Sequence, residues 1–168
     1  MKQQRDDVDE IIAAWRRERP DLDAAPLEVL SRVSRLARRL ELARGSAFSE
    51  QGLEGWAFDV LSALRRAGDP YELSPGRLVQ QTLVTSGTMT NRVDRLERHG
   101  LVERRPDPDD RRGVHVRLTP AGREVVDRAM AGLIAQERSM LADLSAAEQQ
   151  TLAGLLRRLL LPLEPGGH

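Results

Sequence analysis

Residues 73–119 carry the pattern of two short helices followed by a hairpin, and this pattern limits the possible folds most strongly. Ser74, followed by a proline, is typical of a helix start, because the hydroxyl caps free N–H groups and proline suits the first turn. A second helix is expected to start after Thr85 or Ser86 as cap and to stop at Gly100, a residue type that favours the left-handed conformation after a helix. The sequence therefore predicts a helix-turn-helix.

The chain after the second helix changes to a period of two. Residues 101–105 and 114–118 alternate in polarity and predict two paired strands. The loop between them contains two prolines and a glycine and carries Asp110, Arg111 and Arg112. A projecting hairpin with arginines can enter a minor groove, where a narrow width concentrates negative potential. A plain charged turn is the alternative, but the order helix, helix, basic hairpin favours a winged helix-turn-helix.

The second predicted helix has two faces of different chemistry. Its apolar positions recur at i, i+4 and i+7 and predict burial of Met89, Val93 and Leu96. A polar face recurs at i, i+3, i+4 and i+7 and carries Thr88, Asn91, Arg92 and Arg95. Hydroxyl, amide and guanidinium groups read base edges and bind phosphates in the major groove. An ordinary solvated face would show the same periodicity.

The stretch from residue 53 to 119 resembles the DNA-binding domain of the MarR family of bacterial transcription regulators. The segment SGTMTNRVDRLERHGLVER is similar to that family's recognition helix and first wing strand, and DRRG followed by VRLT is similar to its wing. The resemblance implies major-groove contacts from Ser86, Thr88, Thr90, Asn91 and Arg95. It also implies that Arg112, held by Asp110 and next to Arg111, enters the minor groove.

Three more helices are expected around this motif. A helix over residues 53–67 has Trp56 on its buried face, a second starts at the cap Thr119, and a capping box at Ser145 starts a third.

Helical patterns flank the predicted winged domain on both sides. We expect dimerisation helices in residues 1–50 and 120–162, a loop from Gly45 to Gly52, and a disordered tail in residues 163–168. The predicted fold is mainly α with a small β-wing. Because the apolar stripes of the flanking helices exceed what one small domain covers, we expect a homodimer. Its two reading helices would lie about 34 Å apart and require a pseudo-palindromic site.

A narrower resemblance concerns the urate-responsive PecS-type branch of the MarR family. It implies an effector site for a small anionic purine, with Trp15 stacking on the ligand and Arg104 binding its charge. Asp59 would be displaced towards Arg92. Each residue also has a structural interpretation: Trp15 completes an apolar stripe with Val8, Ile11 and Ile12, Asp59 and Arg92 can form an ion pair, and Arg104 can face phosphate or solvent.

Composition narrows the remaining function classes. Lys plus Arg equals Asp plus Glu, 26 each, so any basic surface is local rather than global. Without cysteine, thiol redox sensing is excluded, and the three histidines lack metal-ligand spacing. We find no pattern of an enzyme or cofactor site, no membrane-spanning run and no signal peptide, and we expect a cytoplasmic protein. A winged-helix module that binds protein instead of DNA remains the alternative.

Overall fold

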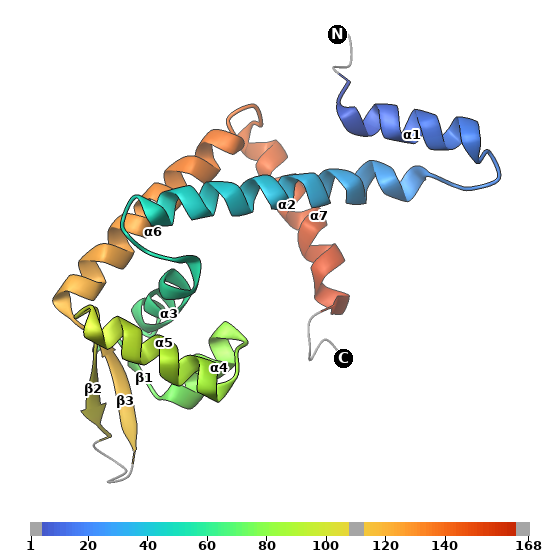
Figure 1. The fold of residues 1–168 in the computed structure, drawn as a ribbon. Coiled ribbons are helices and arrows are strands. Elements are labelled where there is room, and N and C mark those ends of the chain that lie inside the picture. Colours follow the sequence, from blue (N-terminus) through green and yellow to red (C-terminus); the bar gives the residue numbers. More distant parts are fainter. Residues whose placement is uncertain (1–4, 108–112, 164–168) are drawn as a thin grey trace. The chain divides into compact units, whose positions relative to one another are not determined.

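The structure, a computed structural model, describes residues 5–107 and 113–163, and it is mainly helical with one small antiparallel sheet (Figure 1). The α-helices are α1 Asp7–Glu18, α2 Ala25–Ser49, α3 Gly55–Arg66, α4 Pro75–Thr82, α5 Ser86–Arg98, α6 Pro120–Met140 and α7 Ala146–Leu160. A 3-10 turn, Leu161–Leu163, follows α7, and the strands are β1 Glu72–Leu73, β2 Val102–Pro106 and β3 Val114–Leu118. The chain divides into two compact units, residues 1–46 and 47–168, and each is described separately.

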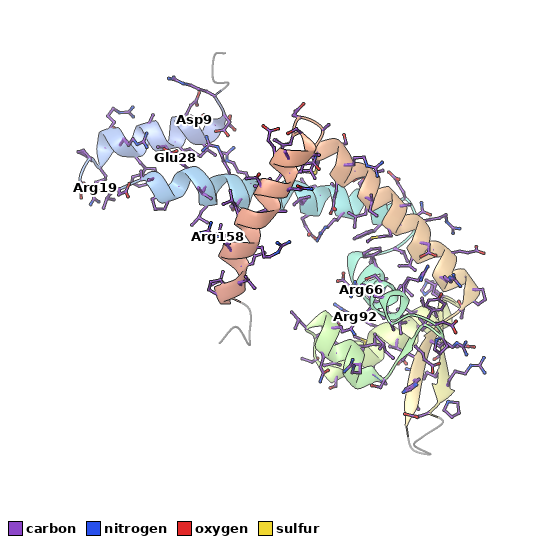
Figure 2. All side chains as sticks on the ribbon, turned by 180° about the vertical axis from the view of Figure 1, so that it is seen from behind. Asp9, Arg19, Glu28, Arg66, Arg92 and Arg158 are labelled. Atoms are coloured by element: carbon purple, nitrogen blue, oxygen red, sulfur yellow. The ribbon has the colours of Figure 1, made fainter. Side chains whose placement is uncertain are left out.

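The first unit consists of α1 and most of α2. Asp6 caps α1 by accepting hydrogen bonds from backbone N–H groups, and Asp9 completes the capping box. Arg32 of α2 forms ion pairs of 2.8 Å with both Asp6 and Asp9, which ties the two helices together. Asp9 is labelled on α1 in Figure 2. A small apolar cluster of Val8, Ile12 and Ala24, with Leu27 packed against it, completes the contact.

Only two of the four side chains predicted to form the buried stripe of α1 are buried. Val8 and Ile12 are buried, but Ile11 and Trp15 are exposed, with 49% of Trp15 accessible. A helix that contacts one partner along a narrow seam buries the i, i+4 pair and leaves its neighbours at the edge. Within the described chain Trp15 is therefore not a core residue.

The predicted loop from Gly45 to Gly52 is wrong in its first half, because α2 continues to Ser49. Ala47 and Phe48 are buried in the core of the second unit, and the Phe48 ring stacks on that of Phe58 at 4.1 Å between centroids. Burial of these two side chains stabilises the end of α2 by more than the low helix propensity of Gly45 costs, which is about 1 kcal/mol. The loop is confined to the few residues before α3.

The second unit is built around the predicted helix-turn-helix. Leu61 and Leu64 of α3, Leu78 of α4, and Met89, Val93 and Leu96 of α5 are all buried in one core. Both predicted strands are confirmed, and the structure adds β1, so that the sheet has three strands in the order β1-β3-β2. A segment of two residues, Glu72–Leu73, is too short to show a period-two pattern, which explains why sequence reasoning missed it.

Helix α6 begins on the winged domain. Thr119 caps it as predicted and also donates its hydroxyl to the Gly100 carbonyl at 2.7 Å. Val126, Ala129 and Leu133 bury their side chains in the same core as α3.

The last two helices are joined by a short turn. Helix α6 ends at Met140, and the predicted capping box at Ser145 starts α7, in which no described residue is buried. The predicted disordered tail is wrong at its first residue, because Leu163 belongs to the 3-10 turn, and residues 164–168 lie outside the described residues. No described helix has the length and apolar character needed to cross a membrane.

Candidate nucleic-acid interface

The turn between α4 and α5 presents the start of α5 to solvent. Leu83 ends α4 in the left-handed region, with φ 54°, and its side chain is 92% exposed. Thr85 then caps α5 by accepting a hydrogen bond from the Thr88 N–H at 3.3 Å. This sharp change of direction separates the axes of α4 and α5 and leaves the first turns of α5 open to a partner.

The five residues of α5 that are predicted to contact DNA are exposed, whereas Met89, Val93 and Leu96 of the same helix are buried. We call this set the polar face of α5, and it comprises Ser86, Thr88, Thr90, Asn91 and Arg95, all exposed. The Thr90 hydroxyl donates to the Ser86 carbonyl at 3.1 Å, which fixes its rotamer. The Asn91 amide makes no hydrogen bond to the described residues and is available to an external partner.

Trp56, at the start of α3, lies beside the polar face of α5. The Cζ atom of Arg95 lies 4.6 Å from the indole centroid and that of Arg92 lies 5.7 Å from it. Figure 2 labels Arg92 on α5. The sequence pattern placed Trp56 on the buried face of α3, but it is only partly buried where it packs against the core. No periodicity signals such a contact, because it joins two helices far apart in the sequence.

Glu54 connects these groups from the N-cap position of α3. Its Oε2 atom accepts the indole N–H of Trp56 at 2.6 Å, and its Oε1 atom accepts Arg95 at 2.5 Å. These contacts, first the hydrogen bond from Trp56 and then that from Arg95, hold the pKa of the Glu54 carboxyl below its ordinary range. A shallow recess of about 220 Å³ lies between this group and α5, lined by Trp56, Thr88, Asn91, Arg92 and Arg95.

The wing is anchored to α5 through Arg104 of β2. Its guanidinium forms ion pairs with Asp94 and Glu97 of α5, and these contacts raise its pKa, the hydrogen bond to Asp94 contributing most. The Glu97 carboxylate also accepts the Arg104 backbone N–H at 3.1 Å. The wing is therefore held against α5 by charge as well as by the sheet. The predicted tip residues Asp110, Arg111 and Arg112 lie outside the described residues.

The four residues of the predicted effector site are distributed over both units. Trp15 is in the first unit, and the other three are in the second. Asp59 of α3 is exposed, and its side chain makes no ion pair with a described residue; Arg92 lies over Trp56 instead. Arg104 is already engaged by the two carboxylates of α5. An anion that binds Arg104 must therefore compete with Asp94 and Glu97.

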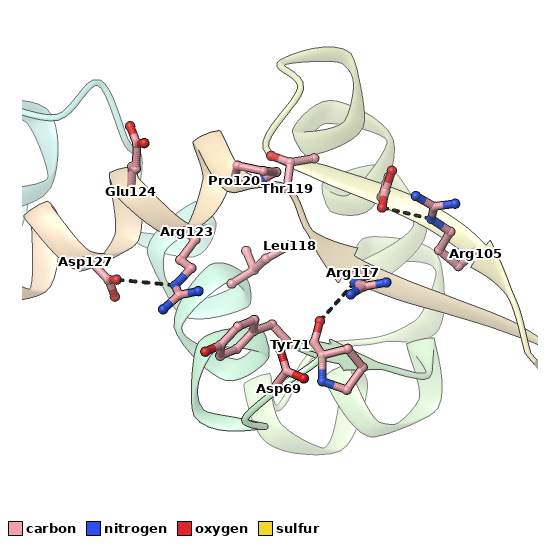
Figure 3. Close-up of a pocket in the computed structure, with 12 residues that line it drawn as sticks. Asp69, Tyr71, Arg105, Arg117, Leu118, Thr119, Pro120, Arg123, Glu124 and Asp127 are labelled. Carbon is pink, nitrogen blue, oxygen red and sulfur yellow. Dashed lines mark hydrogen bonds and ion pairs between the residues drawn. The ribbon is translucent and has the colours of Figure 1, made fainter.

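A second groove, of about 650 Å³, lies on the other part of the winged domain, between the sheet, the α3–β1 loop and the start of α6 (Figure 3). Three arginines and four carboxylates are among its lining residues. Tyr71 also lines it and contacts Arg65 and Arg123, whose Cζ atoms are 4.9 and 4.7 Å from the ring centroid. None of the predicted site residues lines this groove. Among residues 5–107 and 113–163 there is no cluster of side chains able to hold a metal ion.

The chain is similar to several known proteins. A sequence model of the MarR family matches residues 51–113. The HTH-type transcriptional regulator PecS of Dickeya dadantii is 37% identical over 153 residues, which cover 91% of this chain and 92% of PecS. The HTH-type transcriptional repressor NicR of Pseudomonas putida is 31% identical over 83% of this chain and 89% of NicR. A MarR family transcriptional regulator of Streptomyces coelicolor, solved in complex with DNA, superposes with a TM-score of 0.72 at 25% identity, covering 86% of this chain and 91% of that one.

Proposed function

This chain belongs to the MarR family, a family of DNA-binding transcription regulators, and from that premise we propose that it acts as a homodimeric repressor on a pseudo-palindromic operator. Repression is the role named for the relative NicR. In this proposal two copies of α5 enter successive major grooves, about 34 Å apart along the duplex. The wings add contacts in the flanking minor grooves.

The observation that carries the proposal is the polar face of α5. Its side chains are exposed, while Met89, Val93 and Leu96 on the opposite side of the same helix are buried. The helix therefore presents a hydroxyl, amide and guanidinium surface on a rigid support, as base reading requires.

Apolar side chains outside the winged domain support the homodimer. Helix α7 buries none of its described residues, and its Leu155 and Leu159, one turn apart, are each 51% exposed. On α6, Met130 and Ile134 are likewise one turn apart and 44% and 45% exposed. Stripes of this kind are stabilised when a second copy covers them, and a two-fold dimer covers both copies at once.

Binding of the purified chain to the duplex that flanks its own gene tests the DNA-binding role. Fluorescence anisotropy is measured from low to moderate salt, and we expect affinity to fall steeply as salt rises, because phosphate contacts release counterions. Replacing both Arg95 and Arg112 with Ala should abolish binding and leave the thermal unfolding midpoint unchanged within a few degrees. A duplex affinity that changes neither with salt nor with these two substitutions would favour the protein-binding alternative.

We further propose that a small anion, urate or a related purine, lowers the affinity for DNA. The support is the position of Arg104, which joins the wing to α5 through Asp94 and Glu97. An anion that draws Arg104 away from these carboxylates alters how the wing sits on α5. The resemblance further implies that Asp59 then pairs with Arg92, which requires Arg92 to leave the Trp56 ring. Such coupling is typically about 1–3 kcal/mol.

Tryptophan fluorescence tests the effector proposal, because Trp15 and Trp56 are the two tryptophans of the chain. We expect saturable quenching by urate in the wild-type chain and weaker binding in Trp15→Phe. The Arg104→Gln variant should lose the response of DNA affinity to urate. Absence of saturable quenching at millimolar urate would refute the effector role and leave the DNA-binding role intact.

A further inference from the structure

Trp56 is the aromatic group beside the polar face of α5, yet it belongs to the supporting helix α3. We propose that Trp56 is a positioning residue for sequence recognition: its ring holds the guanidinium groups of Arg92 and Arg95 in the orientation in which α5 meets the duplex. This inference rests on the proposed DNA-binding function. It adds a residue that the sequence pattern assigned to the core.

The indole face supports both arginines at once. Their Cζ atoms lie 5.7 and 4.6 Å from the ring centroid, within the range of about 6 Å in which a cation is attracted by the ring quadrupole. Because Arg92 and Arg95 are three residues apart on α5, their like charges are neighbours and repel each other. The negative face of the indole offsets this repulsion and allows both guanidinium groups to remain on one side of the helix.

Glu54 fixes the ring in place. One carboxylate oxygen accepts the indole N–H at 2.6 Å, and the other accepts Arg95 at 2.5 Å. Rotation of the ring would break the first bond and remove the surface on which Arg95 lies. A guanidinium carries five N–H donors, so Arg95 keeps donors for DNA after binding Glu54.

The orientation of the two arginines affects sequence-specific DNA binding and not non-specific binding. Non-specific binding depends on the number of positive charges near phosphates, whereas base reading requires donors in fixed directions. Removing the ring changes no charge, but it removes the surface on which both guanidinium groups lie and leaves Arg95 held by Glu54 alone. The inference therefore predicts a loss of preference for the correct sequence without a loss of general DNA affinity.

The experiment compares two duplexes of equal length: one selected by the wild-type protein from a random pool, and a scrambled one. For Trp56→Leu we expect affinity for the selected duplex to fall about tenfold, the order expected from losing two cation–π contacts. Affinity for the scrambled duplex and the salt dependence should not change. Trp56→Phe keeps a ring and should lose no more than about threefold.

Tyr71 provides a matched control. Its ring also carries two guanidinium groups, those of Arg65 and Arg123, but it lies in the groove of Figure 3 and does not line the recess beside α5. Tyr71→Leu removes an aromatic ring and two cation–π contacts from the same unit. Its affinity for the selected duplex should stay within about twofold of the wild type, because none of these contacts involves α5.

Three results would overturn the inference while the proposed function stands. The first is an equal loss of affinity for both duplexes in Trp56→Leu. The second is a Trp56→Leu affinity for the selected duplex that equals that of Tyr71→Leu, and the third is a Trp56→Leu variant that binds the selected duplex more tightly than the wild type. If Trp56→Leu does not fold, Glu54→Gln is measured instead, because it weakens the contacts that hold the ring and Arg95 and leaves the core unchanged. A smaller ratio of selected to scrambled affinity supports the inference, and an unchanged ratio overturns it. A wild-type chain without any duplex preference refutes both the function and the inference.

Discussion

Gly122 of α6 lies directly against Leu101, the residue that leads from α5 into β2. A Cβ atom at Gly122 would come within 1.9 Å of the Leu101 carbonyl oxygen, and the same carbonyl accepts the backbone N–H of Thr119 at 3.2 Å. Together with the Thr119 hydroxyl on the Gly100 carbonyl, this contact joins the first turn of α6 to the end of α5. The start of α6 is thus fixed by backbone contacts and by the Thr119 cap.

Substitution Gly122→Ala should therefore destabilise the chain strongly. The added methyl group meets backbone, which cannot rotate away as a side chain could, and overpacking of this kind typically costs about 1–3 kcal/mol. We expect a lower midpoint of thermal unfolding, measured by circular dichroism.

Gly132 in the middle of α6 is the matched control. A Cβ atom there has only the Ala47 side chain nearby, at 3.9 Å, which is an ordinary contact. Gly132→Ala should raise stability by about 0.5–1 kcal/mol, the difference in helix preference between the two residues. An unfolding midpoint for Gly122→Ala that equals that of Gly132→Ala would contradict the close contact with Leu101.

Acid should weaken the contact between Glu54, Trp56 and Arg95. The pKa of Glu54 is lowered in the folded chain, so its stabilising effect is complete above the unfolded pKa of about 4.3 and is lost as pH falls through the folded pKa. Glu54→Gln lacks this titration. The wild type should therefore unfold at a higher temperature than the variant at pH 7, and the difference should shrink as pH approaches 3. A difference that is independent of pH would exclude a role for the carboxylate charge.

Sequence periodicity predicted the helices and the wing because their signals are local. Thr85, Thr119 and Ser145 each cap the helix that they were expected to start, and the apolar residues of α5 are buried at the predicted spacing. The failures share a different cause. Phe48 extends α2 because it stacks on Phe58, and Trp56 leaves the core pattern because Arg95 and Glu54 hold it. Contacts between distant segments carry no period and appear only in the folded chain.

The link between the wing and α5 should be measurable as coupling between Arg104 and Asp94. In a double-mutant cycle with Arg104→Gln and Asp94→Asn, we expect about 0.5–1 kcal/mol of coupling in unfolding free energy, since both side chains are partly exposed. High salt should reduce this value by screening. The pair Arg105 and Glu103, which joins two residues of β2 and does not reach α5, serves as control and should show weaker coupling. Additive effects in the Arg104 cycle would remove the proposed route from an anion to the wing.

The exposed leucines of α7 should control assembly and thereby the affinity for DNA. Replacing Leu155 and Leu159 with Glu places two charges on the stripe that we assign to the partner copy, and burial of unpaired charge is strongly unfavourable. We expect the variant to elute as a monomer in size-exclusion chromatography with light scattering, and to bind the full operator no better than a single half-site. Gln150→Glu adds charge to an exposed polar position of the same helix and should remain dimeric. If the leucine variant dimerises like the wild type, α7 is not the interface. If the wild type itself is monomeric at assay concentrations, the model of two α5 helices in successive grooves fails, because one polar face supplies too few phosphate contacts for tight binding.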